Sequence, residues 1–582
     1  MKLNTLFLSI ASLLSLSCAI AQRQNHIRLN QLGFYPGAEK VAVVVGAGEG
    51  TFQLHDAGSD QVVFTGNLSE ERISALSSAR TRIADFTSFG TPGRYFIRIG
   101  GLTDSPPFSI QQNVLKEVGA ATMKAFYYQR ASVDLPKNYA GIWSRKAGHP
   151  DNQVIIHPSA ASAGRPAGTV ISAPLGWYDA GDYNKYIVNS GISMGTILSA
   201  YEDFPKFFKR LNLNIPESSN DVPDILDEAL WNLRWMLAMQ DPKDGGVYNK
   251  LTNPEFDPLD AMPEQAKGVR YVVQKGTAAT LDFAAVAAQA ARVYSVYKKE
   301  FPGLADSCST AAKRAWEWAK RNPAISYEQN VMNRQFEPKI NTGGYGDHDF
   351  RDEFIWAAAE LYTATGDESY LSTVNLFPDT NTPLPSWSQV RLLGYYTLLR
   401  SNYKGAAKAR VEAKRLILKF ADSLLAGTGQ HPYKTVMGKS VRDFNWGSNS
   451  NAANQGIALI QAFLISKDPR YLRGALSNVD YLLGRNATGY CFVTGFGAKS
   501  PLNPHHRPSV ADGIKKPIPG FLVGGPNPGM QDNCEGYPSK IPDEAYADVA
   551  CSYASNEIAI NWNAPAMYLI NAVEALQNKL PK

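Results

Sequence analysis

The stretch Thr277-Ala-Ala-Thr-Leu-Asp-Phe-Ala-Ala-Val-Ala-Ala-Gln-Ala-Ala-Arg-Val-Tyr-Ser-Val-Tyr297 decides the fold of most of this chain. It is rich in alanine, contains neither glycine nor proline, and begins with a threonine that is suited to cap a helix. Apolar residues recur at helical spacing in many segments on either side of it, and no alternating strand pattern separates them. We therefore expect a mainly α-helical fold.

The helices predicted from this periodicity are 114–130, 186–204, 221–240, 277–299, 306–321, 351–365, 387–401, 405–425, 450–465, 468–483 and 556–577. Gly366 marks the end of one of them, because glycine adopts the left-handed conformation after a helix at little steric cost. So many long helices without intervening strands imply a closed array of helical hairpins, not a Rossmann or TIM architecture.

The N-terminal part of the chain has a different pattern. Short apolar runs such as Val41–Val45 and Arg94–Arg98 alternate with turn residues, which is typical of a small β-sandwich. The character changes after Pro106-Pro107. We expect a sandwich over 25–110 and a helical domain over 111–580.

The first residues predict export from the cell. Lys2, an apolar run from Leu6 to Leu16 and Ala19-Ile20-Ala21 together have the form of a secretory signal over 1–21. Cys18 would permit lipid anchoring, which leaves a secreted, a periplasmic and a cell-surface location open. No later run reaches the length of a membrane span.

Four cysteines remain after the signal: Cys308, Cys491, Cys534 and Cys551. Their spacing does not resemble a zinc ligand set, and the sequence does not choose among the possible pairings. A single disulfide in the loop-rich region that holds Cys491, Cys534 and Cys551 is the plainer expectation for an oxidising compartment.

The composition excludes two classes of protein. With 44% hydrophobic residues the chain of 582 residues is too apolar to be disordered, and its net charge of +5 forms no basic stripe for a nucleic acid to follow. Aromatic residues make up 11%, which suits surfaces that stack on flat rings, although core packing explains any single one.

Two long loops, 133–184 and 484–555, interrupt the helices, and loops of this length are usually functional. The first ends in Asp179-Ala-Gly-Asp182, where two carboxylates lie three residues apart. Trp177, Tyr178, Tyr183 and Tyr186 surround them. One interpretation is that these acids only cap a helix and close a turn, and the other is that they are catalytic.

Glu557 lies just after the second loop, next to Ile558, Ile560 and Trp562. A carboxyl group among apolar neighbours loses solvation, and this would raise its pKa and make it a proton donor near neutral pH. The alternative is an exposed glutamate on an amphipathic segment.

The second loop also carries Asn503-Pro-His-His-Arg-Pro508. His505, His506 and Arg507 between prolines offer several rigidly held donors for the hydroxyl groups of a sugar. A metal site is the rival interpretation, but adjacent histidines without a third ligand at suitable spacing argue against zinc.

These motifs together resemble glycoside hydrolase family 9, the family of many cellulases. The resemblance rests on Asp179–Asp182, Phe492-Val-Thr-Gly-Phe-Gly497 with Pro504–Arg507, Trp446-Gly-Ser-Asn-Ser-Asn451 and Asn556–Pro565, which occur in order over about residues 110–580. Any one of them is weak, but four in order are strong. Ile27–Phe34 resembles the immunoglobulin-like module of one branch of the family.

The resemblance implies a barrel of six helical hairpins, (α/α)6, and hydrolysis of β-1,4-glucosidic bonds with inversion. It makes Asp182 the general base, Asp179 a holder of the attacking water and Glu557 the general acid. His506 and Arg507, and His505 with them, would bind sugar hydroxyls. Further candidates for substrate contacts are Trp177, Tyr183, Trp446 and Tyr553.

The chain also departs from the family's pattern. Relatives hold zinc with two cysteines and two histidines after the first barrel helix, but Ala131 and Gly148-His-Pro-Asp151 supply no cysteine here, so that zinc site is expected to be absent. No cofactor is expected to be required. The resemblance also implies a calcium site at Tyr345–Glu353, where Asp347, Asp349 and Asp352 could supply oxygen ligands. The alternative is that they are solvated acids that cap the helix from Asp352.

Three functions follow, of which a secreted endo-β-1,4-glucanase on cellulose-like or related β-glucans is preferred. An exo-acting β-glucosidase or exo-glucosaminidase on the same fold is the alternative, because the 484–555 loop could wall off the cleft. A non-catalytic carbohydrate-binding protein is remote, since it leaves the three acids without a purpose. The expected partner is a polysaccharide or oligosaccharide, and we expect a monomer.

Overall fold

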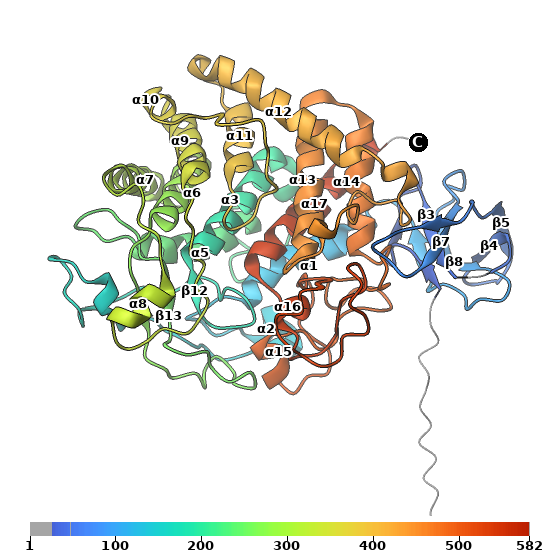
Figure 1. Ribbon diagram of the computed structural model, residues 1–582, viewed down its shortest axis with the longest axis horizontal. Coiled ribbons are helices and arrows are strands. Elements are labelled where there is room, and N and C mark those ends of the chain that lie inside the picture. The colour runs from blue at the N-terminus through green and yellow to red at the C-terminus, as the bar shows by residue number, and fades with distance from the viewer. Residues whose placement is uncertain (1–25, 47, 581–582) are drawn as a thin grey trace, which may run out of the picture.

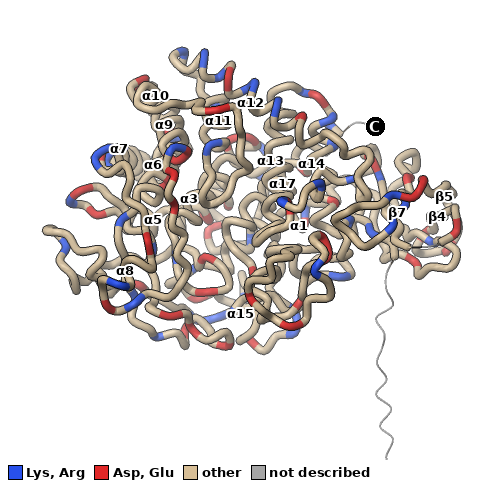
Figure 2. Tube along the Cα trace, in the orientation of Figure 1, with Lys and Arg blue, Asp and Glu red and all other residues tan. Residues whose placement is uncertain are grey.

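In the computed structural model, which describes residues 26–46 and 48–580, a β-sandwich precedes a helical barrel (Figure 1). The predicted signal 1–21 and Cys18 lie outside the described residues. Acidic and basic residues are interspersed along both parts of the trace (Figure 2). Within the described part of the chain, no helix is both long and apolar enough to cross a membrane.

The sandwich consists of two sheets with the strand orders β1-β3-β7-β6 and β2-β9-β8-β4-β5. Pairing is antiparallel except between β2 and β9. Phe34 packs edge-on against Phe86 and Phe108 in the core between the sheets. The strands are β1 (Ile27–Arg28), β2 (Gly33–Phe34), β3 (Val41–Val45), β4 (Thr51–Asp56), β5 (Val62–Asn67), β6 (Arg72–Ile73), β7 (Arg80–Asp85), β8 (Gly93–Arg98) and β9 (Phe108–Ile110).

The barrel alternates outer and inner helices along the chain, and Figure 1 shows the inner ones standing beside one another. The inner helices are α3 (Ile187–Asp203), α6 (Thr277–Tyr294), α9 (Arg351–Thr365), α11 (Arg391–Arg400), α13 (Ser448–Ser466) and α17 (Ile560–Ala575). The outer helices are α1 (Lys116–Tyr128), α5 (Asp224–Ala238), α7 (Leu304–Arg321), α10 (Ser369–Ser372), α12 (Ala407–Leu425) and α14 (Pro469–Leu482). Contacts of α3 with both α6 and α17 close the ring. This is the expected (α/α)6 barrel.

Smaller elements lie in the loops. They are the helices α2 (Lys137–Ala140), α4 (Pro205–Phe208), α8 (Gln329–Gln335), α15 (Arg507–Ala511) and α16 (Tyr553–Asn556), and the 3₁₀ turns Gly141–Trp143, Pro158–Ala160, Ser295–Tyr297, Lys404–Ala406, Thr428–Gln430, Val441–Asp443 and Gln577–Lys579. The strands β10 (Val154–Ile156), β11 (Val170–Ile171), β12 (Lys185–Tyr186), β13 (Lys250–Thr252) and β14 (Tyr271–Val272) form a third sheet of order β11-β10-β14-β13-β12.

Burial explains why α6 carries the alanine-rich stretch. Every residue of α6 except Arg292 is buried, because α3, α7 and α9 all pack against it and small side chains allow their close approach. In contrast, the outer helix α12 buries a narrow stripe that includes Leu416 and Ile417.

The predicted helices are confirmed, with one difference in capping. Gly366 ends α9 in the left-handed conformation with φ of 78°, as expected. The prediction that Thr277 caps α6 is wrong, because Gly276 occupies the cap position. Thr277 is the first helical residue, and its hydroxyl donates to the carbonyl of Asn322 at 2.7 Å.

The alternation of inner and outer helices makes all inner helices run in the same direction. Their N-termini and the two long loops therefore meet at one end of the barrel, the lower end in Figure 1, where β12, α15 and α16 lie. The positive ends of the helix dipoles point to this end and favour negative charge there.

Candidate active site

The segment that leads into α3 places three side chains on one face. A bend at Asp182 and Tyr183 leads into the short strand β12, and the side chains of Asp182, Asn184 and Tyr186 converge. The amide of Asn184 donates to Oδ2 of Asp182 at 2.5 Å, and the phenol of Tyr186 donates to the same oxygen at 3.2 Å. Oδ1 of Asp182 has no hydrogen-bond partner among the described residues and is left for a substrate or water.

Asp179 is held by a second set of donors. Nδ2 of Asn189 donates to its two carboxylate oxygens at 3.0 and 2.9 Å, and the phenol of Tyr345 donates to Oδ2 at 3.3 Å. Burial, and then the negative charge of Asp182, raise the pKa of Asp179 well above its ordinary value. The two aspartates therefore differ in their environment, and neither caps α3.

Glu557 follows α16 and reaches the loop between the two aspartates. The backbone N–H of Gly181 donates to its Oε1 at 3.3 Å. Burial, and then the charges of Asp182 and Asp179, raise the pKa of Glu557 well above its ordinary value, whereas Arg507 lowers it. The direction agrees with the expectation from the apolar neighbours, and it suits a proton donor.

Gly181 allows the two long loops to meet. A Cβ at this position would lie 2.2 Å from the carbonyl oxygen of His505, so no other residue fits. Its own carbonyl accepts from the backbone N–H of Arg507 at 3.1 Å and from Nη1 of Arg507 at 2.8 Å. The backbone N–H of His505 in turn donates to Asn556. Glycine is therefore required where the catalytic segments join.

His505 and His506 lie in different environments. The ring of His506 is buried, with Nε2 3.1 Å from Oε1 of Gln129 and Nδ1 2.9 Å from the hydroxyl of Ser509. This burial lowers the pKa of His506 to about 3. The assignment of His506 to sugar binding therefore does not agree with the structure. His505 is only partly buried, and its Nε2 has no partner among the described residues.

Two predicted aromatic contacts are core residues. Trp177 is buried against Phe126 and donates from Nε1 to Glu228 at 2.8 Å. Tyr183 is buried and donates to the carbonyl of Ala261 at 2.6 Å. Neither ring offers a face to a sugar, because Trp177 is part of the main core of the barrel and Tyr183 is part of a small cluster with Ala131, Tyr178 and Ala266.

Other aromatic side chains do face solvent at this end of the barrel. Trp446 is 43% exposed and lies 5.4 Å from the ring of Tyr553, which in turn contacts His505. Phe256 is 48% exposed and lies under the guanidinium of Arg507. Phe256 was not predicted, and its only sequence signal is an aromatic residue in a polar loop. These rings supply flat surfaces for neutral sugars.

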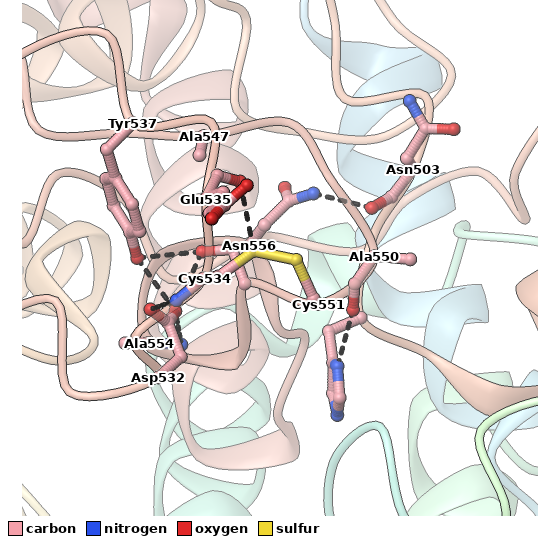
Figure 3. Close-up of a disulfide and its surroundings, with 12 residues drawn as sticks. Asn503, Asp532, Cys534, Glu535, Tyr537, Ala547, Ala550, Cys551, Ala554 and Asn556 are labelled. Atoms are coloured by element: carbon pink, nitrogen blue, oxygen red, sulfur yellow. Dashed lines mark hydrogen bonds between the residues drawn. A yellow bond between two sulfur atoms is a disulfide. The ribbon is translucent and has the colours of Figure 1, made fainter.

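The disulfide joins Cys534 and Cys551 and supports the segment before Glu557 (Figure 3). It confirms the expectation of a single disulfide in this region, while Cys308 and Cys491 are free and buried. Beside it, Asp532 accepts from the hydroxyl of Ser552 and from the backbone N–H of Ala554.

The segment that contains the disulfide also contacts His505. The carbonyl of Ala550 binds Nδ1 of His505 at 2.7 Å. The amide of Asn556 donates to the carbonyl of Asn503 (Figure 3). The disulfide thus stabilises the position of His505 and of the helix that precedes Glu557.

The three predicted calcium ligands do not act as one set. Asp349 pairs with Arg351, and Asp352 accepts from the backbone N–H of Val390 at 2.6 Å. In the described ranges, no three His, Cys, Asp or Glu side chains converge in the geometry of a metal site. Buried carboxylate oxygens of Asp347, and those of Asp282 and Glu353 nearby, nevertheless have no hydrogen-bond partner.

Two buried aspartates, each held by its own donors, and a buried glutamic acid with a raised pKa beside the loop between them define a glycoside hydrolase that works with paired carboxyl groups. The chain belongs to glycosyl hydrolase family 9, whose model matches residues 116–570. The model of the cellulase N-terminal ig-like domain matches residues 22–104.

Similar proteins cover nearly the whole chain. The xyloglucan-specific endo-beta-1,4-glucanase BoGH9A of Bacteroides ovatus is 48% identical over 94% of this chain and 94% of its own length. Endoglucanase D of Acetivibrio thermocellus is 34% identical over 94% of this chain and 83% of its own. The solved structure of Bacteroides ovatus GH9 superposes with a TM-score of 0.90 at 46% identity, covering 95% of this chain and 99% of that one.

Proposed function

We propose that this protein is a secreted endo-β-1,4-glucanase that cleaves the glucan backbone of xyloglucan or a related β-glucan with inversion. The observation that carries the proposal is the hydrogen bond from Gly181 to Glu557, which brings a carboxyl group with a raised pKa to the loop between Asp179 and Asp182. The exposed rings of Trp446 and Phe256 beside them suit a glucan chain. The names of the two relatives above support the substrate class.

The mechanism assigns one step to each acid. Glu557 donates its proton to the glycosidic oxygen, and the bond to the anomeric carbon breaks. Asp182 takes a proton from a water molecule through its free Oδ1, and that water attacks the opposite face of the sugar, while Asp179 orients the water. An inverting enzyme needs roughly 6.5–9.5 Å between its two carboxyl groups to hold this water.

The test removes each acid without changing its shape. Glu557→Gln and Asp182→Asn should lower kcat on xyloglucan by about 10³-fold or more, because each removes a proton-transfer step. Glu535→Gln, which neutralises an exposed carboxylate in the same loop, should keep wild-type activity. Near-wild-type activity in either acid variant would overturn the assignment.

Two product measurements complete the test. NMR of the first product should show the α-anomer, and a β-anomer would overturn inversion. An endo enzyme releases long oligosaccharides in the first minutes, whereas glucose or glucosamine alone at that stage would favour the exo-acting alternative.

A structural calcium ion is part of the proposal, with changed ligands. Because no three carboxylates of the described residues already converge on one point, water or backbone carbonyls would complete its coordination. The buried oxygens of Asp282, Asp347 and Glu353 that lack partners are hard donors of the kind calcium prefers, whereas Asp349 is taken by Arg351. Calcium should raise the unfolding temperature of the wild type and not that of Asp282→Asn. Equal shifts in both proteins, or none in either, would contradict a site there.

A further inference from the structure

Lys250 in β13 is a buried cation without an acidic partner. Its side chain is 0% exposed, and no carboxylate of the described residues pairs with it. Nζ instead donates to Oε1 of Gln329 at 2.7 Å, to the hydroxyl of Thr342 at 3.0 Å and to the carbonyl of Gly343 at 2.6 Å. These three contacts account for the hydrogen-bonding capacity of Nζ.

Burial of an unpaired lysine is costly. It lowers the pKa of Lys250 well below its ordinary value, and the charge of Asp182 opposes this shift. Methionine would fill the same space without the cost of desolvating an amine. Packing alone therefore does not explain why residue 250 is a lysine. The hydrogen bonds of its neighbours offer a reason.

The acceptors of Lys250 lead to the carboxylate of Asp182. Tyr186 and Lys250 face each other in the antiparallel pair of β12 and β13. The backbone N–H of Gly343, whose carbonyl binds Lys250, donates to the phenolic oxygen of Tyr186 at 3.1 Å. That phenol donates to Oδ2 of Asp182.

A second branch reaches the other donor to the same oxygen. The hydroxyl of Thr342 lies 2.6 Å from the hydroxyl of Thr252, whose single hydrogen is shared between Oδ1 of Asn184 at 2.9 Å and the carbonyl of Asn253 at 2.7 Å. The amide of Asn184 donates to Oδ2 of Asp182. Lys250 thus contacts the segment 342–343 that supports both Tyr186 and Asn184.

We propose that Lys250 is a positioning residue for the general base: through Thr342 and Gly343 it holds Tyr186 and Asn184 on Oδ2 of Asp182, so that Oδ1 faces the attacking water. This inference rests on the role proposed above for Asp182. Lys250 does not touch substrate, since no N–H of its ammonium group remains free.

The main test is Lys250→Met with kcat and KM measured separately on xyloglucan. A base that is misplaced by a fraction of an ångström slows the chemical step, so we expect kcat to fall by about 10- to 100-fold with KM within about twofold. Lys275→Met is the matched control. Lys275 is another buried lysine, but it pairs with Asp241 and Asp244 away from Asp182, so its loss should lower stability and leave kcat unchanged.

A double-mutant cycle separates positioning from general support of the fold. Tyr186→Phe removes the phenolic hydroxyl that, in this proposal, connects Lys250 to Asp182. If the two residues form one path, the double variant should be about as slow as the slower single variant. Fold-losses in kcat that multiply would overturn the proposal. Should Lys250→Met fail to fold, Thr342→Val, which removes one acceptor with little change in shape, replaces it in the same cycle.

The outcomes distinguish this inference from the proposed function. An active wild type with unchanged kcat in Lys250→Met overturns the role of Lys250 alone. A wild type that does not cleave any β-glucan overturns the proposed function and the role of Lys250 with it.

Discussion

Arg507 tunes Glu557 as well as joining the loops. Its guanidinium opposes the rise in the pKa of Glu557, which burial and the two aspartates produce. Nη1 and Nε of Arg507 bind the carbonyls of Gly181 and Asp257, and Nη2 has no partner among the described residues. The side chain can therefore bind a sugar hydroxyl while it sets the acidity of Glu557.

Arg507→Met should move the alkaline limb of the kcat/KM profile to higher pH. A general acid works only while protonated, so activity is lost as the pH rises through its pKa, and loss of the cation raises that pKa further. kcat should also fall, because the variant loses the hydrogen bond from Nη1 of Arg507 to the carbonyl of Gly181 that connects the two loops. Arg470→Met, at an exposed arginine on α14, is the control and should leave the profile in place. A shift to lower pH would contradict the assignment of Glu557.

Trp446→Ala should weaken binding of the glucan and leave the chemistry intact. A stacked aromatic ring contributes about 1 kcal/mol, which corresponds to about a fivefold rise in KM with kcat nearly unchanged. Tyr403→Ala removes a ring of similar exposure, 45%, beyond the C-terminus of α11 at the other end of the barrel and should have no effect. An equal rise in KM in both variants would argue against a binding surface at Trp446.

At the scale of elements, we expect the disulfide to affect substrate binding in the cleft more than the stability of the barrel. Cys534 and Cys551 are 17 residues apart, and a crosslink over such a loop stabilises by about 3 kcal/mol at most. Because the loop holds Ala550 against His505, the double variant Cys534→Ser/Cys551→Ser should raise KM and the rate of proteolysis of 532–551.

KM, the unfolding temperature and peptide mapping after brief proteolysis measure these effects. Cys308→Ala, which removes a buried free thiol from α7, serves as the control for loss of a cysteine. A fully wild-type KM in the double variant would show that the disulfide does not support the cleft.

The helices could be predicted from sequence because their signal is local. Alanine content and apolar spacing define α6, and Gly366 defines the end of α9. The short outer helix α10 was not predicted, since four residues give no periodicity. Thr277 was misassigned because a cap depends on one residue of register, which composition does not fix.

The site could be predicted only in part, because some of its features depend on residues that are far apart in the sequence. Asp179, Asp182 and Glu557 lie in recognisable motifs, and the structure brings them together. The burial of Trp177 and His506 depends on partners 51 and 377 residues away, Glu228 and Gln129, so the sequence did not reveal it. Lys250 carries no motif, and its relation to Asp182 arises only from the pairing of β12 with β13.

At the scale of the whole molecule, the sandwich is fastened to the barrel by buried polar pairs. The phenol of Tyr35 donates to Glu574 in α17 at 2.6 Å, and the amide of Asn30 donates to Oδ1 of Asp480 in α14 at 2.8 Å. Asp480 also pairs with Arg485. These buried contacts hold the sandwich against the barrel, and the carboxyl groups among them make this interface sensitive to pH.

Asn30→Ala should destabilise the protein more at pH 7.5 than at pH 4. Burial raises the pKa of Asp480 to about 6, above its value of about 3.9 in an unfolded chain, so stability from this group is complete below about pH 4 and is lost as the pH rises to about 6. The amide of Asn30 opposes this loss by binding the ionised carboxylate. Its removal should cost about 2 kcal/mol above pH 6, the value of a hydrogen bond to a charged group.

Denaturant unfolding at the two pH values measures the difference. Asn30 also accepts from the backbone N–H groups of Leu32 and Gly33, but these bonds do not titrate, so their loss contributes equally at both pH values and cancels. Asn67→Ala, at an exposed position of β5, should cost little at either pH. A loss in Asn30→Ala that is the same at pH 4 and pH 7.5 would show that the side chain acts only within its own turn, and that the charge of Asp480 does not govern how the sandwich is held.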